Sequence, residues 1–450
     1  MNRWQDKRVL ILGAARQGLA LARFLCQNGA VVTLNDQRTT DKLTVEQAAM
    51  RDFPIKWALG GHPLELLDQA DLVCLSGGIP LTLPIVQAAA QRRIAISNDS
   101  QIFMEEVPCR VIGITGSAGK TTTTTLVGRM AAAAYPDHSW VGGNIGLPLI
   151  EYLDRIQPQD TVVLELSSFQ LEQMTCSPQI AAVLNITPNH LDRHGTMAAY
   201  TAAKANILRY QSASDIAVLG RDDPGAWGLK DLAKGAIISF GLNGGQDTVI
   251  DQDWIWIDGR KLLPISAIQL RGEHNLRNVL AACAIGYAAG FPVEALLPAV
   301  DGFGGVPHRL EWVRTLNGVR WYNDSIATAP ERTSAAVRSF DEPLVLMLGG
   351  RDKNLPWGDL AELIHRRVDH VVVFGEAADK ILAALGNTVS GGRPYSIDRC
   401  SGLQTAVQAA AQRAAEGDVV LLSPGGTSFD EFKDFEERGE RFRIWVNQLS

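Results

Sequence analysis

The stretch VIGITGSAGKTTTTTLVGRMAAAA, residues 111–134, decides the fold that the sequence predicts. Its first residues form a short apolar run typical of a buried strand, and its last residues are typical of a helix. Three glycines, Gly113, Gly116 and Gly119, lie at the end of the strand and in the turn, and Lys120 and Thr121 follow at once. Backbone N–H groups at such a turn, with the positive end of the helix dipole, favour a bound phosphate.

This loop departs from the strict pattern G-x-x-x-x-G-K-[ST], because Ile114 stands where the pattern has glycine. A glycine turn that only starts a buried helix is therefore the alternative. The order of strand, loop, lysine and threonine favours the phosphate site. In that site Lys120 would lie along the β- and γ-phosphates, and the Thr121 hydroxyl would reach a magnesium ion.

Short runs of Val, Ile and Leu alternate with alanine-rich amphipathic stretches along the chain of 450 residues. Parallel sheets with crossover helices have this pattern, so we expect an α/β protein. The pattern starts afresh after Pro108 and after Pro307. We therefore predict a Rossmann-like domain at residues 1–107, a central P-loop-type ATPase domain with a mostly parallel sheet at residues 108–306, and a C-terminal Rossmann-like domain at residues 307–450.

The composition excludes several classes of function. Lys and Arg total 42 against 49 Asp and Glu, without a basic block, which argues against a nucleic-acid or anionic-membrane surface. Six cysteines lie far apart without a C-x-x-C pair, so neither a zinc module nor a disulfide framework is expected. No apolar run approaches the roughly 20 residues that span a bilayer. We expect a soluble, cytoplasmic protein.

Polar residues follow several of the predicted strands. Glu165 lies inside an apolar run, where an ionised carboxylate needs a partner such as a metal, although it could also cap the next helix. His190 and Asp192 follow another strand, and Lys204 follows in the next helix. One loop histidine alone is more often a surface residue, but ligands of open α/β sheets gather at such strand ends.

The first strand is followed by GAARQG, residues 13–18, which resembles the dinucleotide fingerprint G-x-G-x-x-G. Ala15 replaces the middle glycine, which hinders close approach of a pyrophosphate, so NAD is disfavoured even though Asp36 ends the next strand. Near the C-terminus, HRLEWV, YNDSIATAP, GGRDK and LLSPGGTSFDEFKDFEERG place polar residues at strand ends or turns. Each stretch alone is typical of an ordinary loop. Their shared position at strand ends favours a second half of a binding site, facing the phosphate loop.

Taken together, the motifs resemble the Mur ligase family over the whole chain. The motifs that carry the resemblance are GITGSAGKTT (113–122), GGNIG (142–146), LELSSFQLE (164–172), NITPNHLDRHG (185–195), AAK (202–204), GEHNLRN (272–278), PHRLE (307–311), NDSIAT (323–328) and SPGGTSFDEFKDFEERG (423–439). GGNIG and the C-terminal motif resemble most closely the members that add D-glutamate to UDP-N-acetylmuramoyl-L-alanine. The D-N-P-R signature of the diaminopimelate- or lysine-adding members is absent, and GGRDKN stands there instead.

The resemblance implies an ATP- and magnesium-dependent ligase, working as a monomer through an acyl phosphate in peptidoglycan precursor synthesis. The implied ATP-binding residues are Gly116, Ser117, Ala118, Gly119, Lys120, Thr121, Thr122, Thr123, Asn278, Arg309 and Asp324. Two magnesium ions would be held by Thr121 and Glu165 and by His190 and Lys204, the lysine being carbamylated. The implied substrate contacts are Gln37, Arg38 and Ser76 for the uridine diphosphate, Asn144 and His190 near the reaction centre, and Thr328, Lys353, Ser428 and Phe435 for D-glutamate. Lys120, His190, Lys204, Arg309 and Lys353 would carry the catalysis.

This sequence departs from the family pattern at four positions. Ala118 replaces a common asparagine, Ile326 a lysine, Gly77 a proline and Gln37 a threonine. The alternatives are another amide ligase of this superfamily, including a folylpolyglutamate-type enzyme, a P-loop kinase, and a nucleotide-binding protein without catalysis.

Overall fold

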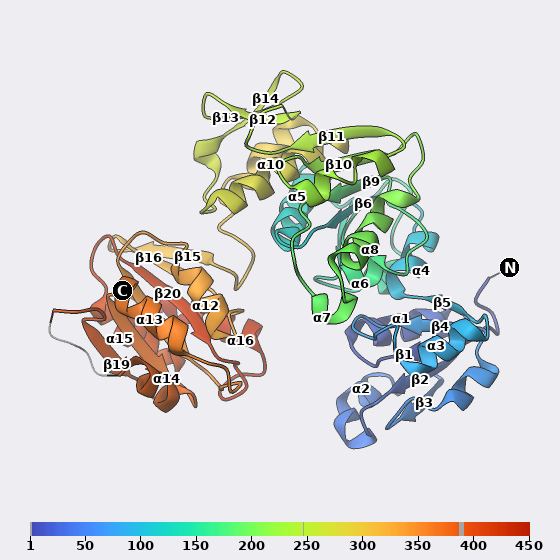
Figure 1. The fold of residues 1–450 in the computed structure, drawn as a ribbon, viewed down its shortest axis with the longest axis horizontal. Coiled ribbons are helices and arrows are strands. Elements are labelled where there is room, and N and C mark those ends of the chain that lie inside the picture. Colours follow the sequence, from blue (N-terminus) through green and yellow to red (C-terminus); the bar gives the residue numbers. More distant parts are fainter. Residues whose placement is uncertain (1, 246, 387–390) are drawn as a thin grey trace. The chain divides into compact units, whose positions relative to one another are not determined.

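The computed structural model describes residues 2–245, 247–386 and 391–450. They form two compact units, Met1–Ile268 with Glu273–Gly302, and Gln269–Gly272 with Phe303–Ser450. The first unit contains a five-stranded and a nine-stranded sheet, and the second a six-stranded sheet (Figure 1). The α/β fold that the sequence predicts is confirmed. Among the described residues, no helix is long and apolar enough to cross a membrane.

The five-stranded sheet is parallel, with the order β3-β2-β1-β4-β5. Because β1 lies between β2 and β4, the strand order reverses at the carboxyl end of β1, where open sheets bind ligands. Leu34 packs in the core on one face, and Leu10, Leu12 and Val73 pack on the other. The elements are β1 Arg8–Leu12, α1 Arg16–Gln27, β2 Val31–Asp36, α2 Thr44–Ala49, β3 Ile55–Leu59, β4 Leu72–Leu75, α3 Pro84–Gln91, β5 Ala95–Ser97 and α4 Asp99–Glu106.

The nine-stranded sheet has the order β14-β13-β12-β11-β10-β9-β6-β8-β7 and is parallel from β7 to β12. The strands β12, β13 and β14 form an antiparallel extension that the sequence analysis did not anticipate. Helix α5 packs against α10. The elements are β6 Arg110–Thr115, α5 Lys120–Ala134, β7 Ser139–Gly143, β8 Thr161–Glu165, α6 Ser168–Leu171, β9 Ile180–Val183, α7 Leu191–His194, α8 Met197–Arg209, β10 Ile216–Gly220, α9 Pro224–Trp227, β11 Ala236–Phe240, β12 Thr248–Asp251, β13 Trp254–Ile257, β14 Arg260–Pro264, α10 Glu273–Ala288 and α11 Leu296–Val300.

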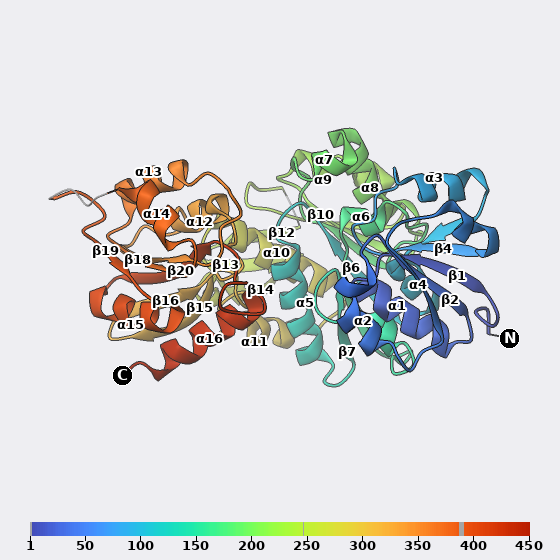
Figure 2. The same ribbon diagram turned by 90° about the horizontal axis from the view of Figure 1, so that it is seen from below.

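In the second unit, the sheet order is β15-β16-β20-β17-β18-β19, and only the β15–β16 pair is antiparallel among the described residues. Leu344, Leu346 and Leu348 of β17 pack with α12, α13 and α14, while Val345 and Met347 pack with α15 and α16. Figure 2 shows these two helical layers on opposite sides of the sheet. The elements are β15 Glu311–Leu316, β16 Val319–Asn323, α12 Pro330–Val337, β17 Leu344–Gly349, α13 Gly358–Arg367, β18 His370–Phe374, α14 Ala378–Leu385, β19 Ser396–Arg399, α15 Leu403–Arg413, β20 Val419–Gly425 and α16 Phe435–Gln448.

Candidate active site

The glycine loop connects β6 to α5, as the sequence predicts. Gly119 precedes the helix with a φ of 82°, in the left-handed region that favours glycine. A Cβ atom at this position would lie 2.1 Å from Oδ1 of Asn278. On its other side the loop is held by Asn185, whose backbone oxygen accepts from Ser117 N at 2.9 Å and whose Oδ1 accepts from Ala118 N at 2.8 Å. Asn185 thus holds the loop by two hydrogen bonds, and Asn278 leaves no room for a side chain at Gly119.

The lysine and threonines after the loop differ in their accessibility. Lys120 Nζ donates to the backbone oxygen of Gly116 at 2.9 Å, so its ammonium lies at the loop. Thr121 is half-buried, whereas Thr122, Thr123 and Thr124 are buried. The hydroxyls of Thr123 and Thr124 have no hydrogen-bond partner within the protein. Thr121 is therefore the accessible threonine hydroxyl closest in sequence to the lysine.

A cavity of about 390 Å³ lies beside the loop. Its lining includes Asn278, which the family resemblance implied for the adenine. Sequence reasoning assigned no role to several residues of its walls. Asn185, Thr187, His274 and Arg277 lie within motifs that carry the family resemblance. Asp222, Asp223, Phe240 and Gly241 lie at or after the ends of strands β10 and β11, outside every motif. A cavity of this size, with apolar and polar walls, suits a nucleotide base.

Glu165 lies at the end of β8 and is 1% exposed. Asn144 binds it twice, through Nδ2 to Oε1 and through its backbone N to the Glu165 backbone oxygen, each at 2.8 Å. The other carboxylate oxygen, Oε2, is buried without a hydrogen-bond partner. Buried carboxylate oxygens are normally paired or bound to a cation, so this orphan oxygen fits a metal ligand better than a helix cap.

Lys204 is also buried, at 1% exposure. Its Nζ donates to Gly116 O at 2.9 Å and to Thr115 Oγ1 at 3.2 Å, which places it beneath the phosphate loop. Burial and the positive charge of Lys120 lower the pKa of Lys204 to about 7, while the negative charge of Glu165 opposes this shift. Burial therefore favours the neutral form of this amine.

His190 precedes the short helix α7, with a φ of 53°. Its ring packs against Phe169, with 5.1 Å between the ring centroids. Partial burial lowers the pKa of His190. The positive charges of Lys120 and Lys204 lower it further, whereas the negative charge of Asp192 raises it. A neutral imidazole is the form that binds metals.

The side chains near the phosphate loop suit a magnesium ion that is held partly by substrate phosphates. Among residues 2–245, 247–386 and 391–450, no three His, Cys, Asp or Glu side chains lie together as a metal site. Magnesium in phosphate-transferring sites is commonly held by one or two carboxylates together with substrate phosphates. The orphan oxygen of Glu165 fits this sparse type of site.

The residues implied for uridine diphosphate lie directly after strands of the first sheet, Gln37 and Arg38 after β2 and Ser76 after β4. Asp36 accepts from Ala14 N at 2.8 Å and from Arg38 Nε and Nη2 at 3.0 and 2.9 Å, so its carboxylate is bound within the protein. Burial raises the pKa of Asp36, but these hydrogen bonds outweigh it and lower the pKa to about 2. Gln37 is exposed, and the Oγ of Ser76 is buried without a hydrogen-bond partner.

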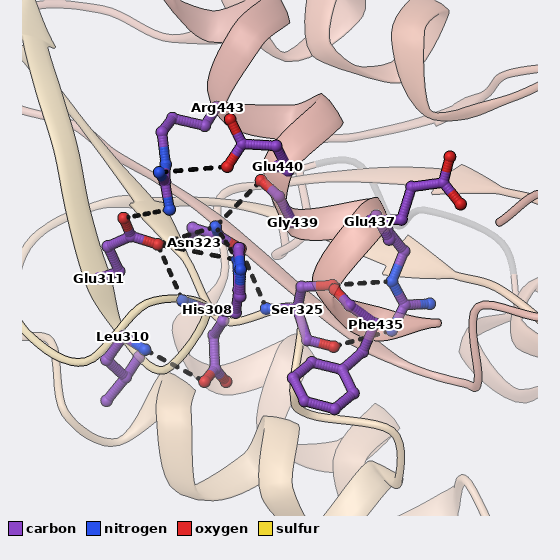
Figure 3. A network of polar contacts seen from close by, with 12 residues as sticks. His308, Leu310, Glu311, Asn323, Ser325, Phe435, Glu437, Gly439, Glu440 and Arg443 are labelled. Carbon is purple, nitrogen blue, oxygen red and sulfur yellow. Dashed lines mark hydrogen bonds and ion pairs between the residues drawn. The ribbon is translucent and has the colours of Figure 1, made fainter. Parts of the chain in front are cut away.

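In the second unit, a polar network holds the backbone at His308 and Leu310 (Figure 3), the residues on either side of Arg309. His308 N donates to Glu311 Oε2 at 2.8 Å, and Leu310 N donates to Asp324 Oδ1 at 3.2 Å. Asn323 Nδ2 is 3.0 Å from both Glu311 Oε2 and His308 Nδ1. The backbone is therefore anchored on both sides of Arg309.

Asp324 is 5% exposed, and its Oδ2 accepts from Ser423 Oγ at 2.8 Å. Burial raises its pKa to about 7, against the hydrogen bonds from Ser423 and Leu310. The side chain is therefore held in a defined position at the edge of the turn that carries Arg309.

We expect the stability effect of Asp324→Asn to depend on pH. The folded carboxyl, with a pKa of about 7 against 3.8 as its ordinary value, stabilises the fold below about pH 4, and this contribution is lost as the pH rises through 7. Asparagine does not titrate, so the Tm of the variant relative to wild type should be higher at pH 8 than at pH 5. Thermal unfolding at both pH values measures this, with exposed Asp341→Asn as control. An equal difference at both pH values would contradict the raised pKa.

Of the residues implied for D-glutamate, Thr328, Lys353 and Ser428 lie in the loops that follow strands β16, β17 and β20, and Phe435 lies at the start of a helix. Lys353 Nζ donates to Thr328 Oγ1 at 3.2 Å. Ser428 is 2% exposed, and Phe435 starts α16, where its backbone oxygen accepts from Ser325 Oγ at 2.8 Å.

Sequence reasoning missed Arg438, which is fully buried in the same region. It donates from Nε to Ser325 Oγ at 3.0 Å and from Nη2 to Ser325 O at 2.8 Å. Burial lowers the pKa of its guanidinium to about 10, against the charges of Asp430 and Glu431. Nothing in the sequence motif distinguishes this arginine from an exposed helix residue.

The parallel sheets, the glycine loop before α5 and the buried carboxylate at the end of a neighbouring strand define a nucleotide-binding α/β protein of the phosphate-loop class. Residues 7–98 match the MurD-like N-terminal domain of Mur ligases, residues 114–286 the Mur ligase middle domain, and residues 308–426 the Mur ligase glutamate ligase domain. The chain belongs to the Mur ligase family.

Curated relatives match the chain over nearly its full length. It is 42% identical to the UDP-N-acetylmuramoylalanine--D-glutamate ligase of Symbiobacterium thermophilum, over 99% of both chains. It is 38% identical to the ligase of the same name from Acetivibrio thermocellus, over 99% of this chain and 97% of the relative.

Solved structures agree in fold. The UDP-N-acetylmuramate-alanine ligase MurC of Thermotoga maritima aligns with a TM-score of 0.59 and 19% identity, covering 98% of this chain and 99% of that one. The MurF ligase of the same organism, in complex with ADP, aligns with a TM-score of 0.54 and 18% identity, covering 99% and 96%.

Proposed function

We propose that the chain is an ATP-dependent ligase that adds D-glutamate to UDP-N-acetylmuramoyl-L-alanine in peptidoglycan precursor synthesis. The observation that carries this proposal is the full-length identity of 42% and 38% to ligases of that name. The phosphate loop with Lys120, and the neighbouring cavity lined by Asn278, support ATP as the second substrate.

The chemistry explains the kinds of residue in the site. A carboxylate is a poor electrophile in water, so its oxygen first attacks the γ-phosphorus of ATP, giving an acyl phosphate and ADP. The amine of D-glutamate then attacks the acyl carbon, an amide bond forms and phosphate leaves with the bonding electron pair. Two anions meet in the first step, and we assign Lys120 and Arg309 to neutralising their repulsion.

Bound magnesium would neutralise phosphate charge in the same step. We assign Thr121 and Glu165 to one ion, and His190 and Lys204 to a second. The assignment of Glu165 rests on its orphan oxygen, and that of Lys204 on a carbamate group. A neutral lysine amine attacks the carbon of CO₂ and loses a proton, which leaves a carbamate with two oxygens. The lowered pKa of Lys204 favours this reaction.

The substrate contacts follow the same assignment. Asn144, whose amide is hydrogen-bonded to Glu165 and so lies beside the assigned metal ligand, would contact the acceptor near the reacting carboxylate. Ser76, with a buried and unpartnered hydroxyl, would hold the uridine diphosphate together with Gln37 and Arg38. Thr328, Lys353, Ser428 and Phe435 would bind D-glutamate, and Asp324 the ribose of ATP.

We also infer three domains, at residues 1–107, 108–306 and 307–450. The restarts of the strand pattern after Pro108 and Pro307 support these boundaries. We also propose a cytoplasmic location, since ATP and the UDP-linked acceptor are cytosolic nucleotides, and a monomeric state.

The proposal predicts that phosphate release from ATP requires both UDP-N-acetylmuramoyl-L-alanine and D-glutamate. Omitting either substrate should reduce the rate to the background of ATP hydrolysis, because no acyl phosphate forms or none is consumed. A coupled phosphate assay with the full-length protein measures this, with L-glutamate as the matched control substrate. Release with another amino acid would indicate a different ligase, and absence of release under all conditions would indicate a nucleotide-binding protein without catalysis.

A further inference from the structure

The loop that carries Lys353 contains an acidic residue directly before it. Asp352 and Lys353 are neighbours in the stretch GGRDKN, residues 349–354. The Lys353 ammonium donates to Thr328 Oγ1 at 3.2 Å, whereas no hydrogen bond or ion pair among the described residues joins it to Asp352. An anion so close in sequence would compete with an anionic substrate for the lysine. The structure gives Asp352 other partners.

Lys380, in the first turn of α14, pairs with Asp352 at 2.5 Å between Nζ and Oδ2. The same oxygen accepts from Asn354 N at 2.9 Å, and Oδ1 accepts from Trp357 Nε1 at 3.3 Å. Partial burial raises the pKa of Asp352, but these bonds outweigh it and keep the pKa below its usual value. The carboxylate is therefore charged, and its charge is matched by Lys380.

The rest of the loop is fixed independently of this pair. Arg351 forms a two-pronged ion pair with Glu376, at 2.8 and 3.0 Å. Its backbone pairs with Thr427, with N–O distances of 2.7 and 2.8 Å, next to Ser428. Loss of Lys380 would thus leave the loop backbone held at Arg351 and change chiefly the charge balance beside Lys353.

We propose that Lys380 is a positioning residue of the amino-acid site, which holds Asp352 away from Lys353 and so leaves the Lys353 ammonium for the carboxylate of the substrate. The inference rests on the proposed function, in which Lys353 binds D-glutamate. It adds to the amino-acid site a residue from helix α14, which lies outside every motif that the sequence analysis singled out.

The test is a set of variants in the full-length protein, assayed with D-glutamate and ATP varied separately. Lys380→Met should raise the KM for D-glutamate about 10-fold, because Asp352 becomes unpaired beside an anionic ligand. The KM for ATP should not change. Adding Asp352→Asn to Lys380→Met removes the unpaired charge and should bring the KM for D-glutamate back to within about 2-fold of wild type.

Arg399→Met is the matched control. It removes one positive charge and breaks an exposed ion pair to Asp379, the residue before Lys380, with 2.6 Å between Nη1 and Oδ1. Its kinetic constants should match wild type. Lys380→Glu provides a second variant, for which the increase in KM should exceed that of Lys380→Met and should shrink at high salt.

Three results would overturn the inference while leaving the proposed function intact. They are an unchanged KM in Lys380→Met, a raised KM that Asp352→Asn does not restore, and an equal increase in Arg399→Met. Failure of the wild-type protein to use D-glutamate would instead overturn the proposed function, so the two failures are distinguishable.

Discussion

The Lys204→Ala variant is expected to lose about 1000-fold or more in kcat, the scale seen when a preorganised charge-stabilising group is removed. Lys204 lies beneath the phosphate loop, bonded to Gly116 O and Thr115 Oγ1, and its carbamate would supply a charged oxygen beside the γ-phosphate. The measurement is kcat in the coupled phosphate assay, together with the KM values for all three substrates.

Chemical rescue separates a missing charge from a damaged fold. The alanine variant leaves space where a short-chain carboxylic acid could bind, so added acetate or propionate should restore part of the activity. In wild type, removal of CO₂ from the buffer should lower activity and bicarbonate should restore it. The exposed Lys230→Ala, in the same compact unit, is the control and should behave as wild type. Full activity of Lys204→Ala would remove the carbamate and the second metal site from the proposal.

The Glu165→Gln variant is expected to lose activity on a similar scale and to require more magnesium. The amide keeps the shape of the side chain, including an oxygen that can accept from Asn144 Nδ2, but it removes the charge on the buried orphan oxygen. Because an unpaired buried carboxylate is costly without a cation, the variant should be at least as stable as wild type in the absence of magnesium. Magnesium titration of kcat and thermal unfolding without the metal measure both effects.

Asp160→Asn is the matched control, since Asp160 directly precedes the same strand and is also buried. Its carboxylate has partners in the protein: Oδ2 accepts from Trp140 Nε1 at 2.8 Å and from Gln157 N at 3.0 Å. This variant should therefore lose stability and keep its magnesium dependence. A Glu165→Gln variant with the same loss of stability and unchanged magnesium dependence would indicate that Glu165 only caps the following helix.

Much of the fold could be predicted because its strands are buried on both faces. Runs such as Val9 to Leu12 and Leu344 to Leu348 are apolar throughout, which distinguishes parallel strands from half-exposed ones. The antiparallel extension β12–β14 lacks this signal, since β13 alternates between half-buried and buried residues and both β12 and β14 contain exposed ones.

The residues of the candidate site also divide into those that the sequence predicts and those that it does not. Lys120, Glu165 and Lys204 could be chosen from the sequence because each carries its chemistry in a local motif, at a strand end or on the helix after it. Asp222, Phe240 and Lys380 could not, since their contribution depends on which strand ends and helices lie side by side.

The sequence by itself determined the α/β class, the phosphate loop and the family, because these depend on local periodicity and on short motifs whose geometry is nearly independent of the rest of the chain. Only the tertiary structure decided which charges are balanced. Asp352 is paired with Lys380, 28 positions further along the chain, and one oxygen of Glu165 has no hydrogen-bond partner. Hydrogen bonds and ion pairs act over a few ångströms between residues that can be far apart in sequence, such as Arg438 and Ser325, which are 113 positions apart, so no local pattern encodes them.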